Sequence, residues 1–311
     1  VDWAARSLRV AAAVQIPSRA HGLLPMSDGG MTVAALRPGW WLMRLDPDGR
    51  VLTRLDIRDE PRERHFAGHV VASPDERWLY TTETDLSDGE GLVGLRDART
   101  LRKLAEWRTH GIEPHQVLRD PRDGSLVVAN GGIRRDAFDR KIDLERMDST
   151  LVQIDAEAGR LLGQWRLADR QLSMRHLAFA DDGLLGVALQ AEHRAPREQL
   201  AAPSLALWDG RDLVTAEGGD GYAGDITAVP GGGFVVSHAL RDAAWWWHPD
   251  AGPRLTRVAQ LQRAYALAAD NGVMIAAARG LARWHPHEPG AMMGWPEDMA
   301  LDNHMVVLQP A

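Results

Sequence analysis

Histidine recurs at one place in a repeating unit of this chain. Five repeats carry histidine there and two carry other polar residues, which gives seven stations: His21, His69, His115, His176, Asp225, Tyr265 and His304. Each of the first six opens a short apolar run, and a turn rich in Gly, Asp or Pro separates that run from a second one. Because neutral imidazole binds zinc, copper, iron and nickel, the pattern points to a transition-metal site.

The spacing of these stations predicts the fold. Successive stations are 48, 46, 61, 49, 40 and 39 residues apart, and a repeat of roughly 40 to 50 residues is typical of propellers and solenoids. The apolar runs are short, rich in Val and Leu and cut by turns, which favours strands over amphipathic helices. Most units read as four short strands each.

Two apolar segments are left over, LRVAAAVQI near the N-terminus and DNHMVVL near the C-terminus. Neither makes a sheet alone, and closed β architectures remove unpaired strand edges. We therefore predict an all-β, seven-bladed β-propeller closed by strands from both termini. We expect residues 1–311 to form this single domain, with an inserted surface loop at about 134–147 that explains the long step after His115.

Composition excludes several classes of function. The net charge of -7 is spread without a basic stripe, which argues against nucleic-acid binding. The sequence contains no run of 18 apolar residues, so it predicts no membrane-spanning helix. The absence of cysteine excludes disulfides and thiolate ligands, and no familiar catalytic motif such as HExxH or GxSxG is present. The chain starts at Val1 without a signal-like stretch, as expected of a processed or shortened form.

The propeller geometry brings two sets of polar residues to one mouth of the channel. Loops that enter the first strand of each blade and loops that leave the second strand lie on the same face, so the stations should meet a second set: Arg37, Glu83, Asp85, Asn130, Gln190, His238 and Arg279. A ring of seven stations is too wide for one ion, so we expect a subset to bind it. The alternative is a hydrated channel whose polar side chains bind only water.

Other histidines divide into two groups. His65 and His110 precede His69 and His115 in loops that approach the mouth, where they could orient a ligating ring. The remaining group lies on outer turns and is assigned to the surface: His248, His285 and His287.

Several segments in order resemble a bacterial family, domain of unknown function 1513: RHFAGHVVASPDERWLYTTETD, HGIEPHQV, VVANGGI, MDSTLVQID, LSMRHLAF and DNHMVVL. The resemblance runs from about His21 to Leu308. Proteins of this family are typically exported, often with a twin-arginine signal, and tend to be encoded beside imelysin-like iron-regulated proteins and di-haem peroxidase-like proteins. The resemblance thus implies a periplasmic protein connected with iron or another transition metal.

Twelve residues match positions in the family's motifs: His21, His65, His69, Glu83, Asp85, His110, His115, Asn130, Arg175, His176, Gln190 and His304. Three features depart from the family. Glu113 stands where a glycine is common before the proline, Gln116 replaces an acidic residue, and the SHALRD stretch around His238 differs from the usual one.

These observations lead to one main hypothesis, an exported propeller that binds iron or copper, or a complex of such a metal, and serves iron acquisition or handling. The expected ligands are His65, His69, Glu83, His115, His176 and His304, and the expected cofactor contacts are His21, Asn130, Arg175 and Gln190. Imelysin-like or haem-containing periplasmic proteins are the expected partners. The alternatives are a metal-dependent enzyme, either a lactonase-like hydrolase or a copper redox protein, and a non-catalytic interaction propeller.

Overall fold

The computed structural model describes residues 1–136 and 138–308, and its regular structure is almost entirely β-strand. The chain divides into two compact units. One comprises residues 14–177 with Leu308 and is called the histidine unit; the other comprises residues 1–13 and 178–307 and is called the second unit.

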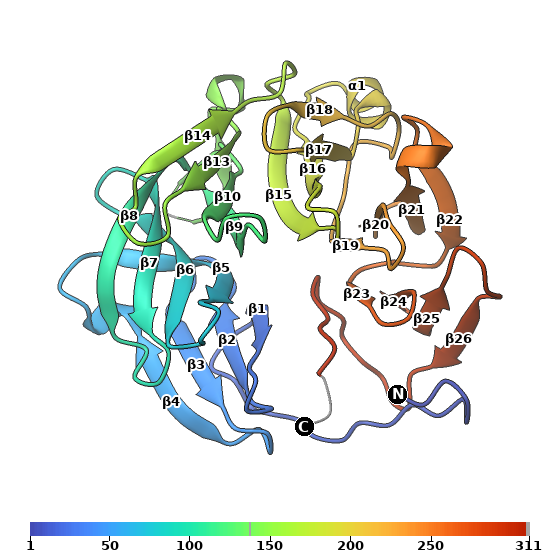
Figure 1. Cartoon of the computed structure of the whole chain (residues 1–311), viewed down its shortest axis with the longest axis horizontal. Helices are drawn as coiled ribbons and strands as arrows, with labels where there is room; N and C mark the ends of the chain where they lie inside the picture. Colours follow the sequence, from blue (N-terminus) through green and yellow to red (C-terminus); the bar gives the residue numbers. More distant parts are fainter. Residues whose placement is uncertain (137, 309–311) are drawn as a thin grey trace. The chain divides into compact units, whose positions relative to one another are not determined.

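The histidine unit contains three four-stranded antiparallel sheets. They are formed by β1 (Ala20–Pro25), β2 (Met31–Ala35), β3 (Trp41–Leu45) and β4 (Val51–Asp56); by β5 (Arg64–Ala72), β6 (Trp78–Asp85), β7 (Glu90–Asp97) and β8 (Lys103–Ile112); and by β9 (Pro114–Arg119), β10 (Leu126–Asn130), β13 (Thr150–Ile154) and β14 (Leu161–Trp165). Within this unit, β1, β5 and β9 lie on one side and β4, β8 and β14 on the opposite side (Figure 1).

The turn between the third and fourth strand of each sheet is built in the same way. Asp97 ends β7, and Asp46 and Asp155 directly follow β3 and β13. Each side chain accepts a hydrogen bond from a backbone N–H three or four residues further on. Asp is favoured in such turns because its carboxylate replaces a backbone acceptor. A residue with positive φ then completes each turn, as Gly49 and Gly159 do. The repeated turns visible in the sequence therefore set the strand boundaries.

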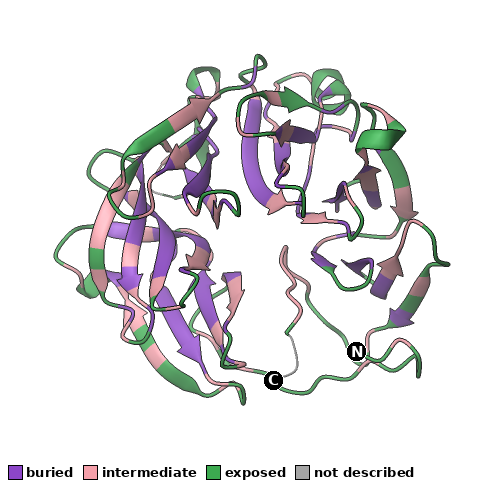
Figure 2. Ribbon diagram, in the orientation of Figure 1, coloured by how far each residue is buried: buried purple, intermediate pink, exposed green. Residues whose placement is uncertain are grey.

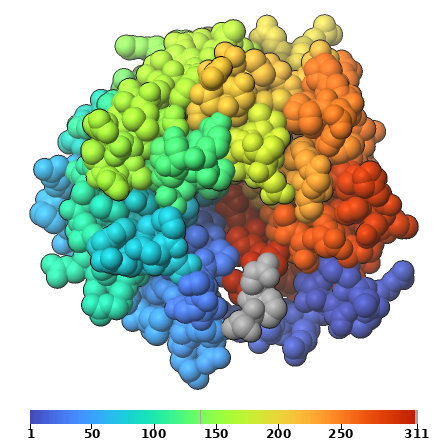
Figure 3. Space-filling view, viewed as in Figure 1, coloured from blue at the N-terminus to red at the C-terminus, as the bar shows by residue number. Residues whose placement is uncertain are grey.

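Apolar residues from neighbouring sheets form the core of the histidine unit. Leu42 of the first sheet packs with Phe66 and Leu79 of the second, while Val93 of the second packs with Val128 of the third. Figure 2 shows the second and third strands of these sheets mostly buried and the fourth strands mostly intermediate or exposed. The space-filling view in Figure 3 shows the blue, cyan and green sheets of this unit adjoining in chain order on one face.

The second unit repeats the pattern. The boundary between the units falls inside β15 (Leu172–Phe179), the first strand of the sheet β15-β16-β17-β18. The remaining elements are β16 (Leu185–Ala191), α1 (Pro196–Ala201), β17 (Leu205–Trp208), β18 (Leu213–Thr215), β19 (Ile226–Ala228), β20 (Phe234–His238), β21 (Ala243–Trp247), β22 (Thr256–Gln260), β23 (Leu267–Ala269), β24 (Val273–Ala277), β25 (Gly280–Trp284) and β26 (Ala291–Gly294). In the part of the chain that the structure describes, no helix is long and apolar enough to cross a membrane.

The predicted seventh blade was wrong. Residues 1–136 and 138–308 form six four-stranded sheets, and neither terminal segment adds a strand. The apolar residues of these segments are used for packing: Leu8 and Met305 cover the sheet β23–β26, and Val14 and Ile16 cover the first sheet. The apolar runs of the two termini, which resemble strands in the sequence, thus pack against neighbouring sheets without pairing as strands.

The insertion after β10 forms a small hairpin. Its strands are β11 (Arg134–Arg135) and β12 (Lys141–Ile142), and the short 3-10 helix η2 (Leu144–Arg146) follows. Arg135 of this hairpin reaches the body of the histidine unit, where it pairs with Glu113.

A buried ion network crosses the second sheet. Glu83 on β6 is fully buried, and its two carboxylate oxygens pair with Arg96 of β7 at 2.8 Å and Lys103 of β8 at 2.6 Å. Burial opposes ionisation of Glu83, but these two cations outweigh it and lower the pKa of its carboxyl. Because removing one partner of a buried pair leaves a charge without compensation, the loss of a single member of this network should destabilise the fold.

Replacing Glu83 by Gln preserves its shape and removes its charge. We expect Glu83→Gln to lower the free energy of unfolding in urea at pH 7 by about 3 kcal/mol, because buried Arg96 loses a partner. The exposed Glu157→Gln is the control, with an expected change within about 0.5 kcal/mol.

The effect of Glu83→Gln should also depend on pH. Since the folded state holds the pKa of Glu83 below its ordinary value of 4.5, its stabilisation is present above that pH and is lost as the pH falls further. The difference between wild type and Glu83→Gln should therefore shrink below about pH 4.5. A difference that stays constant down to acid pH would contradict the role given to the charge.

Candidate metal centre

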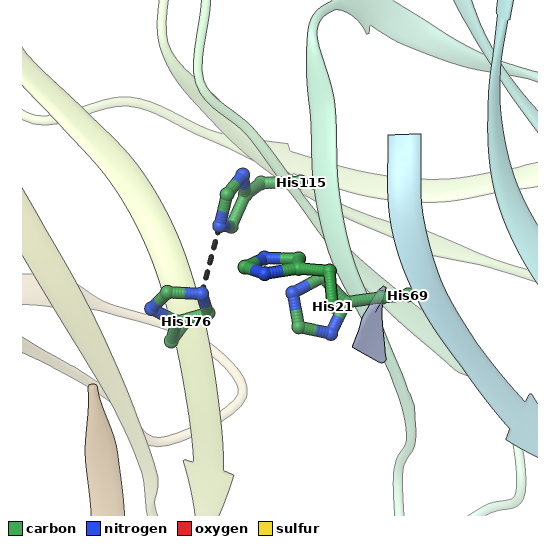
Figure 4. A group of neighbouring side chains, drawn as sticks. All are labelled: His21, His69, His115 and His176. Atoms are coloured by element: carbon green, nitrogen blue, oxygen red, sulfur yellow. Dashed lines mark hydrogen bonds between the residues drawn. The ribbon is translucent and has the colours of Figure 1, made fainter. Parts of the chain in front are cut away.

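Four histidines of the histidine unit converge. His21, His69, His115 and His176 come from β1, β5, β9 and β15, and one ring nitrogen of each lies within 4.8 Å of the corresponding nitrogens of the other three. All four residues are between 2% and 7% exposed. Figure 4 shows the four rings gathered together, with those of His115 and His176 joined by a hydrogen bond. The arrangement could hold a metal ion.

The spacing of the rings can be compared with that around an ion. An imidazole bound at roughly 2.1 Å places its ring centre about 3 Å from the ion, so the ring centres of four tetrahedral ligands are about 5 Å apart. The six distances between ring centres here range from 4.5 Å to 5.8 Å. A square-planar set would require opposite rings more than about 6 Å apart. The ring centres are therefore spaced much as in a tetrahedral set, and the Nε2 atoms of His115 and His176, now 2.8 Å apart, would separate to about 3.4 Å to bind one ion.

His115 and His176 are the closest pair. Their Nε2 atoms are 2.8 Å apart, and a hydrogen bond joins them. Burial, followed by the neighbouring His176 and Arg175, holds the pKa of His115 well below its ordinary value of 6.5. His115 is consequently neutral at pH 7, which is the protonation state that a metal ligand needs.

Irregularities in the first strands accompany three of these histidines. His115 lies between Pro114, which pairs with Asn130, and Gln116, which pairs with Ala129. His21 and His69 lie in similar interruptions of the β1–β2 and β5–β6 ladders. A β-bulge changes the direction in which a side chain points. The fold uses the same device repeatedly to turn a first-strand residue toward the cluster.

Glycine permits the close approach of β1 and β5. A Cβ on Gly22 would lie 2.5 Å from the backbone oxygen of Gly68, and a Cβ on Gly68 would lie 2.7 Å from Cδ2 of His21. Gly68 also has φ of +119°, a conformation that L side chains rarely adopt. Both positions require glycine for His21 to reach His69.

Polar side chains tie the histidine-bearing strands together. The Oγ1 atom of Thr82 accepts a hydrogen bond from the backbone N–H of His69 and lies 3.2 Å from the backbone oxygen of His115, to which it can donate. The Oε1 atom of Gln116 accepts a hydrogen bond of 2.6 Å from the backbone N–H of Leu177, next to His176. These contacts fix the backbones that carry three of the four rings.

A cluster of three arginines around Glu113 adjoins the histidines. Arg37, Arg135 and Arg175 all pair with Oε1 of Glu113, at 3.2, 2.7 and 2.8 Å. Burial opposes ionisation of Glu113, but the three guanidiniums outweigh it and lower the pKa of Glu113 to about 2. Nη1 of Arg37 also lies 3.4 Å from Nδ1 of His115, so this cluster contacts the candidate centre.

The four-histidine group contains three of the six predicted ligands, namely His69, His115 and His176. Its fourth member is His21, which was predicted as a cofactor contact. Glu83 is engaged by Arg96 and Lys103, and the ring of His65 contacts the backbone oxygen of Phe66. These two are outside the four-histidine group. Their assignment as ligands stays a prediction.

Four further predicted residues lie elsewhere. Asn130 donates hydrogen bonds to Thr109 and Thr150, and Arg175 pairs with Glu113. In the second unit, Gln190 donates to the backbone oxygen of Ala223 at 3.3 Å, and Nδ1 of His304 is 3.4 Å from Asp225.

The Arg37–Glu113–Arg135 cluster was missed at the level of sequence. One signal could have indicated it, since Glu113 replaces the glycine that is common in the resembling family. Its φ of +56° explains why glycine suits the position. A charged residue held in that conformation indicates a requirement for its side chain.

Comparison with known proteins identifies a family and a fold. A family model described as "Protein of unknown function (DUF1513)" matches residues 14–308. No curated protein matches the sequence significantly.

Solved structures show the β-propeller fold. Virginiamycin B lyase from Staphylococcus aureus has a TM-score of 0.65 at 10% identity, over 90% of this chain and 86% of that one. A streptogramin B lyase has a TM-score of 0.67 at 11% identity, over 94% and 88%. A catalytically inactive virginiamycin B lyase variant from S. aureus with quinupristin has a TM-score of 0.61 at 12% identity, over 89% and 84%. At such identities the likeness concerns the fold alone.

The close fit of Gly68 against His21 can be tested by Gly68→Ala. We expect it to cost about 1–3 kcal/mol more in unfolding free energy than a control, because the added methyl group overpacks a buried site, and to shift the NMR signals of the His21 ring. The control is Gly89→Ala, which also has positive φ but has no atom within 4 Å of the added Cβ. Equal costs for the two substitutions would refute the proposed contact.

Proposed function

Because the chain belongs to the DUF1513 family, which is described only as proteins of unknown function, we propose a function from its own geometry: it binds one transition-metal ion through His21, His69, His115 and His176. The observation that carries the proposal is the convergence of four buried imidazoles from four strands, with ring nitrogens within 4.8 Å of one another.

The type of ligand limits the choice of metal. Imidazole nitrogen suits zinc, copper, iron and nickel, whereas magnesium, calcium and manganese prefer oxygen. The carboxylate of Glu113, which Arg37 connects to His115, is engaged by three arginines. We propose iron or copper as the ion. A role in iron handling, a periplasmic location and imelysin-like or haem-containing partners come from the family resemblance and stay predictions.

The number of ligands favours binding over hydrolysis. Catalytic zinc-type sites keep one position open for water or substrate, whereas closed four-ligand sites hold the ion without it. An ion bound by all four histidines would have no such position. The protein is therefore proposed to hold its ion, and activation of water would require one ring to leave.

Metal analysis of protein purified without an affinity tag tests this proposal. After incubation with equimolar Fe²⁺, Cu²⁺ and Zn²⁺ and removal of excess metal, we expect about one ion per wild-type chain and a loss of most of it in a His115→Ala, His176→Ala double variant. The control is His285→Ala, His287→Ala, which removes two histidines outside the cluster and should keep its metal. Equal and negligible metal in wild type and the cluster variant would refute the proposal, and zinc in place of iron or copper would refute the choice of metal.

Removal of the ion should lower stability. A ligand that binds only the folded state at 100 times its dissociation constant stabilises it by about 2.7 kcal/mol. Calorimetry should therefore show that a chelator lowers the melting temperature of the loaded wild type but leaves that of the His115→Ala, His176→Ala variant unchanged. An equal effect on both proteins would place the ion elsewhere.

A further inference from the structure

Arg37 places a positive charge beside the four-histidine group. It lies between β2 and β3, its side chain is 17% exposed, and its Nη1 atom is 3.4 Å from Nδ1 of His115. The Nε2 atom of the same ring lies 2.8 Å from Nε2 of His176, so Nε2 is the ligand atom that His115 offers to an ion. Arg37 therefore contacts the other nitrogen of that ring.

The second nitrogen of a metal-bound imidazole ordinarily donates its hydrogen to a carboxylate, a carbonyl or water, which makes the ring a better ligand. At His115 the neighbour of this nitrogen is a guanidinium, which has only donors and a full positive charge. Two N–H groups would face each other once an ion occupied Nε2 of His115. Arg37 thus opposes positive charge at the centre.

Ion pairs hold Arg37 in this place. Its Nη1 atom pairs with Oε1 of Glu113 at 3.2 Å, and the same oxygen also pairs with Arg135 and Arg175. Asp139 lies 3.7 Å from Nε of Arg37 and 3.6 Å from Arg135. Since three guanidiniums share these two carboxylates, Glu113 does not neutralise Arg37 alone, and Arg37 is the member that contacts His115.

The ligands themselves bring no negative charge. Among the described residues, the group that could hold an ion consists of four histidines and contains no carboxylate. Histidine binds metal as neutral imidazole. The whole charge of a bound ion would therefore remain in a site whose histidines are between 2% and 7% exposed, where burial penalises charge. An ion with one positive charge is penalised less than an ion with two.

Coordination geometry separates the two oxidation states of copper. Cu²⁺ prefers square-planar or tetragonal surroundings, whereas Cu⁺ has the filled d shell of Zn²⁺ and accepts four tetrahedral ligands. The ring centres are at most 5.8 Å apart, which is less than the distance of about 6 Å that a square-planar set requires. Zn²⁺ and Fe²⁺ also bind imidazole nitrogen, but each carries two charges. Cu⁺ suits both the spacing and the charge of the site.

We propose that the four-histidine group binds copper as Cu⁺ in preference to Cu²⁺, and that the charge of Arg37 contributes to this preference. The inference rests on the metal binding proposed above and narrows the choice of ion. Arg37 acts through His115 and is a positioning residue, not a ligand.

The distance from Arg37 sets the size of the effect. An ion bound at roughly 2.1 Å from Nε2 of His115 would lie within about 8 Å of Nη1 of Arg37. At an effective dielectric constant of about 20, a unit charge at that distance changes the affinity by roughly tenfold for each positive charge on the ion. Arg37 should therefore weaken the binding of Cu²⁺ by the square of the factor by which it weakens that of Cu⁺.

The affinities of the full chain for the two ions test the proposal. They are measured by competition with bicinchoninate for Cu⁺, without oxygen, and with nitrilotriacetate for Cu²⁺. We expect the wild type to bind Cu⁺ at least roughly a hundredfold more tightly than Cu²⁺. Arg37→Gln should raise the affinity for Cu⁺ by roughly tenfold and that for Cu²⁺ by roughly a hundredfold.

Two variants serve as controls. Arg37→Lys keeps the charge and should keep the preference for Cu⁺, whereas Arg140→Gln removes an arginine that is 72% exposed in the same unit and should change neither affinity. A merely structural role of Arg37 would change both affinities by the same factor, and that result would overturn its assignment. Binding of Cu²⁺ by the wild type as tightly as Cu⁺ would overturn the preference itself, and this measurement needs no variant.

Failure of the proposed function gives a different result. If the wild type and the His115→Ala, His176→Ala variant bind Cu⁺ with the same affinity, the four histidines hold no ion and both proposals fall. If the wild type binds Fe²⁺ more tightly than Cu⁺ and the double variant does not, the metal centre stands and the preference for Cu⁺ is overturned.

Discussion

The near-contact between the backbones of β1 and β5 is the constraint on which the candidate centre depends. His21 can approach His69 only because Gly22 and Gly68 present no side chain between these strands. Interruptions in the strand ladders then turn His21, His69 and His115 toward a common point. The chemistry of the centre thus rests on places where the regular sheet pattern is broken.

Buried charge is handled in two ways within the same unit. Glu83 is fully matched by Arg96 and Lys103 inside a sheet, which makes it a structural network. Around Glu113, three guanidiniums share one carboxylate oxygen, and Asp139 lies 3.7 Å from Arg37 and 3.6 Å from Arg135. Polar networks whose members are satisfied stiffen a fold.

The sequence allowed the repeat to be recognised because it depends on local turn chemistry. His21, His69, His115 and His176 do lie in the first strands of successive sheets, and Asp225 directly precedes β19. The prediction of a seventh blade failed because the sequence of an apolar run does not show whether the run will pair as a strand or pack against a neighbouring sheet. Leu8, for example, packs against a sheet. Burial and charge partners on other strands could not be predicted from the sequence either, so the pairing of Glu83 with Arg96 and Lys103 on β7 and β8 was not foreseen. The pairing of Glu113 with Arg37 and Arg135 joins segments whose contact only the folded chain creates.

The order of the four histidines along the chain has a consequence for how the fold could be opened. His21, His69, His115 and His176 are separated by 48, 46 and 61 residues in a chain that contains no cysteine. An ion held by all four would close three long loops at a single point, and closing one loop of that length removes roughly 4 kcal/mol of chain entropy from the unfolded state. Such a cross-link is indifferent to thiol reductants and opens instead to acid or to a competing chelator. The stability of the histidine unit would then depend on the concentration of free metal around the protein.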